Sequence, residues 1–147
     1  MIVHIYRVVP LMVSCLLLAA VAMVGGCVLP GRPAVLVEYW RTGGFAGVDD
    51  HLTVYENGQA ILTYKGGQKD FVLQRDQVQR LIQLLDEAKF GSLKKEYIPG
   101  NTCCDLFEYR ISYKGHTIRT MDTAVPNVLQ PILDSLNEIV RTQARSQ

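Results

Sequence analysis

The residues best suited to metal or acid–base chemistry are the histidines, and the sequence holds three of them, His4, His51 and His116. His4 lies in an apolar leader, and no His-x₃-His or Cys-x₂-Cys spacing occurs anywhere in the chain. A protein zinc site needs three or four ligands and further groups that orient them. We therefore expect no metal site, and we interpret His51 and His116 as solvent-facing histidines of strands.

Serines and paired carboxylates form no catalytic pattern either. Ser92, Ser112 and Ser135 lack the Gly-x-Ser-x-Gly surroundings of an activated serine, and nucleophilic catalysis also needs a base beside the nucleophile. Asp49 and Asp50 are adjacent, but neighbouring side chains of an extended chain point apart. We expect these two to be solvated turn residues. The sequence thus predicts a protein that is not an enzyme and uses no cofactor.

A glycine-rich segment runs through Gly43, Gly44, Phe45, Ala46 and Gly47. It shares its glycines with phosphate-binding loops, but it lacks their Lys-Ser/Thr pair and the helix that follows it. Glycine adopts positive φ without strain. One interpretation is therefore a structural corner that places Phe45 in the core.

Cys103 and Cys104 are adjacent, and two readings of them stay open. Consecutive Cα atoms lie about 3.8 Å apart, which is shorter than the usual span of a disulfide. A strained ring between the two cysteines would stiffen the loop around them. Two separate thiols are the alternative.

The first 26 residues have the shape of a secretory signal peptide, with one positive charge at Arg7, an apolar run and small residues before Cys27. Val24-Gly25-Gly26-Cys27 resembles the lipobox of bacterial lipoproteins, which implies that Cys27 is acylated and becomes the mature N-terminus. We expect residues 27–34 to be the lipidated cysteine and a Pro/Gly spacer. An uncleaved membrane helix and a soluble secreted protein are the alternatives. The lipoprotein reading places the domain outside the cytoplasm, on the cell membrane or the outer membrane.

Charge excludes one class of partner. Arg7 is the only charged residue of the leader, so the rest of the chain carries 14 basic and 14 acidic side chains. A neutral domain without a basic stripe has no electrostatic reason to bind nucleic acid.

Hydrophobic periodicity predicts the elements that follow the spacer. Residues 35–41, 52–56, 60–64 and 70–73 read as a four-stranded meander, with a tight turn at Asn57-Gly58. Three- and four-residue spacing predicts a helix over residues 75–88, and residues 94–102 read as a polar loop. Alternation then predicts a hairpin of residues 106–113 and 116–121. Asn127 is the expected N-cap of a last helix that ends near residue 140, with Pro131 at its fourth position.

This order predicts an α+β domain over residues 35–141, with an antiparallel sheet of about six strands and two helices on one face. Residues 142–147 are expected to be a frayed tail.

Several spaced pieces of the domain resemble one protein family. The run from Tyr39 to Val48, a leucine-rich helix, the alternation after Asp105 and a segment from Asp122 to Leu136 are similar to emfourin-type inhibitors of thermolysin-like metalloproteases such as protealysin. The pieces span about residues 35–140, and the glycine-rich segment is the most distinctive of them.

The resemblance implies a membrane-anchored protein that blocks the cleft of a thermolysin-like zinc protease. It implies an inhibitory loop of Gly43, Gly44, Phe45, Ala46, Gly47, Val48, Asp49 and Asp50. Phe45 or Val48 would fill an apolar pocket, and Asp49 or Asp50 would approach the zinc of the protease. The alternative is a binding or scaffold lipoprotein of the cell envelope that has the fold without the inhibition.

Overall fold

The computed structural model describes residues 33–102 and 105–145, and these belong to one compact unit, Pro33–Gln147. The predictions for the leader, for Cys27 and for Cys103 and Cys104 lie outside the described residues. So do those for the spacer up to residue 32.

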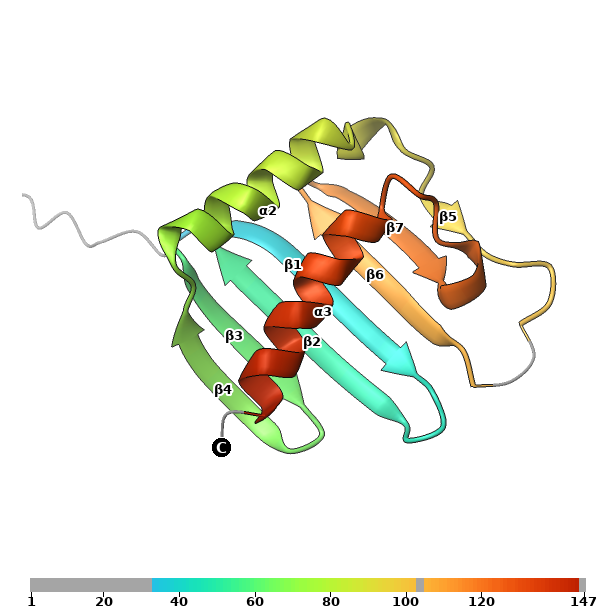
Figure 1. The fold of residues 1–147 in the computed structure, drawn as a ribbon, viewed down its shortest axis with the longest axis horizontal. Helices are drawn as coiled ribbons and strands as arrows, with labels where there is room; N and C mark the ends of the chain where they lie inside the picture. The colour runs from blue at the N-terminus through green and yellow to red at the C-terminus, as the bar shows by residue number, and fades with distance from the viewer. Residues whose placement is uncertain (1–32, 103–104, 146–147) are drawn as a thin grey trace, which may run out of the picture. The chain divides into compact units, whose positions relative to one another are not determined.

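A seven-stranded sheet forms one layer of the domain (Figure 1). Its strands follow the spatial order β4-β3-β2-β1-β6-β7-β5, and every neighbouring pair is antiparallel except β5 and β7, which are parallel. The strands are β1 (Val35–Gly43), β2 (Val48–Tyr55), β3 (Gln59–Tyr64), β4 (Gly67–Val72), β5 (Glu96–Tyr97), β6 (Phe107–Tyr113) and β7 (His116–Met121). The first strand of the domain is therefore its central strand, hydrogen-bonded to β2 on one side and to β6 on the other.

Two helices cover one face of this sheet, α2 (Arg75–Glu87) and α3 (Gln130–Arg145) (Figure 1). Two short 3₁₀ helices, η1 (Phe90–Ser92) and η2 (Asp122–Ala124), lie in the connections. The predicted α+β class, with both helices on one face of a mostly antiparallel sheet, is confirmed.

The core lies between the sheet and the two helices. Alternate side chains of the strands face the helices, while α2 and α3 contribute apolar stripes of three- and four-residue spacing, as burial of one helix face requires. The largest of the fully buried side chains are Tyr39, Leu52, Leu62, Leu81, Leu85, Phe90, Ile111, Ile118, Leu129, Ile132, Leu133 and Leu136. Residues of opposite parity on the strands face away from the helices.

Three boundaries differ from the prediction. β2 begins at Val48, so Asp49 and Asp50 belong to a strand and not to a turn. The predicted polar loop contains the two-residue strand β5. α3 begins at Gln130, after a turn in which the Gln130 amide bonds to Asn127 O, and Asn127 is therefore not its N-cap. Pro131 is thus the second helical residue, where a missing N–H removes no intrahelical bond.

The end of the last helix also differs from the expected frayed tail. α3 continues to Arg145, so residues 142–145 are helical. Val140 remains buried, and Lys69 Nζ bonds to Gln143 O at 3.1 Å. The helix therefore gains contacts with the sheet beyond the last residue of its apolar stripe.

Candidate functional site

The glycine-rich segment forms the tip of the β1–β2 hairpin. β1 ends at Gly43 and β2 begins at Val48, with Gly43 and Val48 paired across the ladder. The Gly47 amide bonds to Gly44 O at 3.0 Å, which closes the turn, and the Gly44 amide bonds to Leu106 O at 3.3 Å. The tip is thus tied to the chain that precedes β6 as well as to its own strands.

Two of these glycines are required by their surroundings. Gly43 has φ +108°, and a Cβ atom there would lie 2.4 Å from Leu106 O. Gly44 has φ +68°, and its Cβ would lie 2.7 Å from the Phe107 ring. Backbone atoms leave no room for a Cβ at Gly43, and the positive φ of both glycines disfavours a side chain at either position, so the hairpin can pass close against the start of β6.

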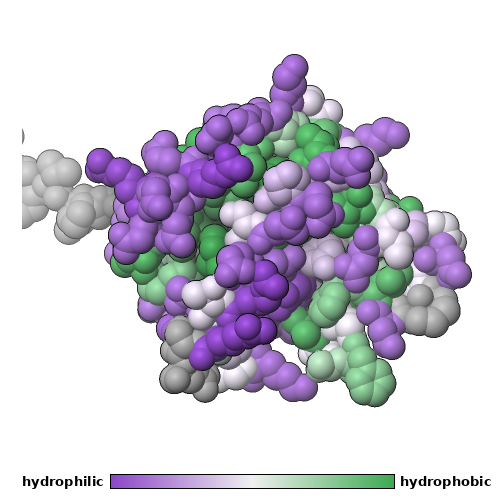
Figure 2. Space-filling model, in the orientation of Figure 1, coloured by the Kyte–Doolittle hydropathy of each residue, from purple (hydrophilic) through white to green (hydrophobic). Residues whose placement is uncertain are grey.

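Phe45 projects from this tip into solvent. The residue is 94% exposed, more than any other large apolar residue of the described chain. Figure 2 shows apolar atoms protruding at the tip of the β1–β2 hairpin. The interpretation of the segment as a corner with Phe45 in the core is therefore wrong, because the turn at Gly44 and Gly47 directs the phenylalanine away from the sheet.

The two aspartates of the predicted loop have different environments. They occupy successive positions of β2 and so point to opposite faces of the sheet, as expected. Asp49 is exposed, but Asp50 is only 7% exposed, so its assignment as a solvated turn residue is wrong. Asp50 Oδ2 accepts hydrogen bonds from Arg41 Nε at 3.0 Å and from Arg41 Nη2 at 2.5 Å.

A polar network joins this pair to α3. Asn137 Oδ1 accepts bonds from Arg41 Nη1 at 3.1 Å and from the Tyr39 hydroxyl at 2.8 Å. Burial is the main reason that the pKa of Tyr39 is raised far above its ordinary value, with the Arg41 charge opposing it. The network, which sequence reasoning missed, fixes the base of the hairpin against the helix.

A second polar group supports the hairpin from β6. Asp122 accepts bonds from the Tyr109 hydroxyl at 2.5 Å and from the Phe107 amide at 2.8 Å. Burial, followed by the bond to Asp122, raises the pKa of Tyr109. The Phe107 ring, which covers Gly44, also lies 5.6 Å below the Arg41 guanidinium. Arg41 therefore connects both supports.

A groove of about 320 Å³ runs beside the hairpin. It lies between the tips of the β1–β2 and β3–β4 hairpins and the C-terminal half of α3, and its lining is Arg41, Ala46, Val48, Asp50, Tyr64, Lys65, Val140, Arg141, Ala144 and Arg145. Lys65 Nζ donates to Ala46 O at 3.3 Å across one end of the groove. The groove and the exposed Phe45 thus share one corner of the domain.

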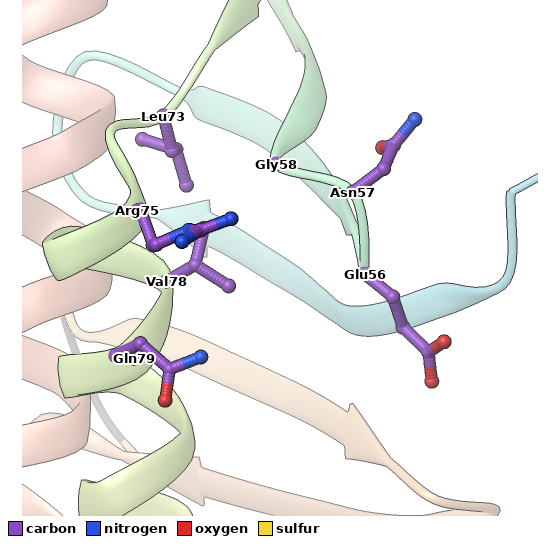
Figure 3. Close-up of a pocket in the computed structure, with 7 residues that line it drawn as sticks. All are labelled: Glu56, Asn57, Gly58, Leu73, Arg75, Val78 and Gln79. Carbon is purple, nitrogen blue, oxygen red and sulfur yellow. The ribbon is translucent and has the colours of Figure 1, made fainter.

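A larger hollow of about 470 Å³ lies at the other end of β2, between the β2–β3 turn and the start of α2 (Figure 3). Figure 3 shows Arg75, Val78 and Gln79 on the helix side and Asn57 and Gly58 on the turn side. The residues that line this hollow include neither a nucleophile beside a base nor a set of metal ligands.

In the described part of the chain, His51, His116 and Ser92 make separate contacts and are not grouped as a nucleophile and its base. The His51 ring stacks on Trp40 at 4.6 Å between centroids, on the face away from the helices. His116 lies 3.1 Å from Leu93 O through Nε2, and Ser92 Oγ donates to Lys89 O at 2.7 Å. Across residues 33–102 and 105–145, no three His, Cys, Asp or Glu side chains are grouped as metal ligands.

In the same part of the chain no helix has both the length and the apolar character needed to cross a bilayer.

Comparison with known proteins adds no assignment. No protein-family model matches the chain, and no curated protein matches it. The geometry of the hairpin, its supports and the groove therefore carries the functional argument.

Proposed function

We propose that this protein is a lipid-anchored inhibitor of a thermolysin-like metalloprotease and that the β1–β2 hairpin tip occupies the protease cleft. The single observation that carries the proposal is the exposure of Phe45 on a hairpin that is held from several sides. An exposed aromatic side chain on a rigid support binds a pocket with little loss of conformational entropy. The resemblance of the glycine-rich segment to emfourin-type inhibitors supplies the class of partner.

The supports of the hairpin also restrict which residues reach the protease. Asp50 is occupied by Arg41 and buried beneath α3, so we no longer assign it a contact with zinc. Asp49 is exposed and remains the carboxylate that the proposal directs toward the zinc ion. Phe45 fills the apolar pocket, and Val48 lies in the groove at the base of the hairpin.

The test is inhibition of thermolysin by residues 28–147, which retain the whole compact unit. We expect micromolar protein to suppress cleavage of a peptide substrate, and we expect Phe45→Ala to weaken inhibition by about 30-fold, the loss typical of a central aromatic contact. Val72→Ala is the matched control, because Val72 is also exposed (66%) but lies on edge strand β4. Unfolding free energies of both variants should stay within about 0.5 kcal/mol of the parent.

Undiminished protease activity at micromolar protein would instead support the alternative of a binding or scaffold lipoprotein. Equal inhibition by the Phe45→Ala variant and the parent would contradict the assignment of the hairpin tip as the contact.

The lipid anchor is tested separately by metabolic labelling with a fatty acid. We expect the full chain to be labelled and Cys27→Ser to lose the label, while Cys15→Ser, a change at a cysteine within the apolar run, keeps it. Two acyl chains hold a protein on a bilayer stably because each buried CH₂ contributes roughly 0.8 kcal/mol. Equal labelling of Cys27→Ser and the parent would refute the anchor and leave the inhibition test unaffected.

A further inference from the structure

The groove beside the hairpin combines an apolar floor with a positive rim. Val48, Val140 and Ala144 supply the apolar floor, and four basic side chains surround a single carboxylate, that of Asp50. Figure 2 shows hydrophilic side chains gathered over the C-terminal half of α3, above this corner of the sheet. A groove of this kind accommodates an extended segment that carries both apolar and acidic side chains.

The positive charge of the rim is only partly neutralised within the domain. Arg41 is paired with Asp50, and Arg141 Nη2 bonds to Glu138 Oε2 at 2.6 Å. Lys65 and Arg145 take part in none of the ion pairs between described residues. Since the chain after the leader has equal numbers of basic and acidic residues, this excess is local, and it attracts carboxylates.

The position of the groove argues for a protein partner rather than a lipid headgroup. The described chain starts at Pro33, next to the start of β1, and the groove lies at the other end of this nine-residue strand, where Arg41 is part of its lining. Nine extended residues span about 30 Å. A tether that precedes Pro33 is therefore attached at the end of β1 that is remote from the groove.

We propose that the groove binds an extended acidic segment of the partner protein, next to the pocket that receives Phe45. Carboxylates of the segment pair with Lys65 and Arg145, and its apolar side chains lie on Val48 and Ala144. This inference rests on the proposed function and deepens it, because it assigns the partner an acidic strip beside its cleft.

The probe is a fluorescein-labelled decapeptide of alternating glutamate and leucine, titrated with the full chain in detergent and followed by fluorescence anisotropy. We expect binding that weakens as salt rises and an affinity about tenfold lower for Lys65→Glu with Arg145→Glu, because two attractions become repulsions. Arg75→Glu with Arg80→Glu on α2 is the control of equal net charge, and it should leave the affinity unchanged. Urea unfolding of each variant verifies that the comparison is between folded proteins.

The outcomes of this experiment test the groove, the kind of partner and the proposed function separately. Equal affinity of the groove variant and the parent, or an equal loss in the α2 control, overturns the groove. Tighter binding to phosphatidylglycerol vesicles than to the peptide, lost in the groove variant, overturns the protein partner. The Phe45→Ala variant should keep the affinity for the peptide. Groove-dependent binding of the peptide without inhibition of the protease would therefore refute the proposed function alone, and inhibition without groove-dependent binding would refute the groove alone.

Discussion

The Arg41–Asp50 pair provides the sharpest test of how the hairpin is held. Removing one partner of a fully buried ion pair costs about 3–5 kcal/mol, whereas an exposed pair contributes at most about 1 kcal/mol. The side chains here are 19% and 9% exposed, and Asp50 Oδ2 accepts two of the guanidinium N–H groups. We therefore expect Asp50→Asn to lower the free energy of unfolding by about 2–3 kcal/mol.

Urea unfolding of residues 28–147 measures this change. With a denaturant slope of about 1.5 kcal/mol per molar urea, the midpoint should fall by about 1.5 M. Asp49→Asn is a matched control, because the same chemical change one residue away affects an exposed side chain, and its midpoint should change little. A double-mutant cycle with Arg41→Met should give a coupling energy above about 1.5 kcal/mol. Equal midpoints for Asp50→Asn and Asp49→Asn would refute the reasoning.

The remaining predictions concern stability. Gly43→Ala should destabilise the domain by more than about 2 kcal/mol because its Cβ would meet Leu106 O at 2.4 Å, whereas Gly47→Ala, with open space around it, should cost only about 1 kcal/mol for its positive φ. Equal urea midpoints for the two variants would contradict this. Burial raises the pKa of Tyr39 and of Tyr109, so the folded protein keeps both hydroxyls protonated at a pH where the unfolded chain ionises. Their contribution to the free energy of unfolding is complete below about pH 10, the pKa of tyrosine in the unfolded chain, and is lost as the pH rises above it. Stability should fall by up to about 1.4 kcal/mol per pH unit for each tyrosine, and Tyr39→Phe with Tyr109→Phe should flatten this slope between pH 9 and 11.

The local pattern of apolar and polar residues was sufficient to predict most of the helices and strands. Alternation in residues 106–121 predicted β6 and β7 almost to the residue, and three- and four-residue spacing predicted α2. β5 was missed because Glu96–Tyr97 is too short to show a period and is a strand only through its pairing with Arg119 and Thr120 of β7. The central position of β1 was also beyond local pattern, since its partner β6 lies some seventy residues away in the chain.

The candidate site, too, could be predicted only in part, because its geometry depends on residues that are distant in the chain as well as on neighbouring ones. The glycines predicted a loop, but the outward direction of Phe45 was known only from the folded hairpin, in which the turn closed by Gly44 and Gly47 carries this residue into solvent. Asp50 was misread because β2 was expected to begin at residue 52. Had pairing been counted back from the glycine turn, Arg41 would have been placed opposite Asp50, which is the register that the sheet has. Asn137 had no such signal, because its contact depends on how α3 crosses the strands.

The place of β1 has a mechanical consequence. A tether ahead of Pro33 and a partner gripping the β1–β2 tip would load the same strand from its two ends. Because β1 is already extended, tension between its two ends would pass along its own backbone, and the ladders to β2 and β6 would not have to open. If the protein is anchored and bound as we propose, the pull between anchor and partner would therefore follow a strand that has neighbours on both sides.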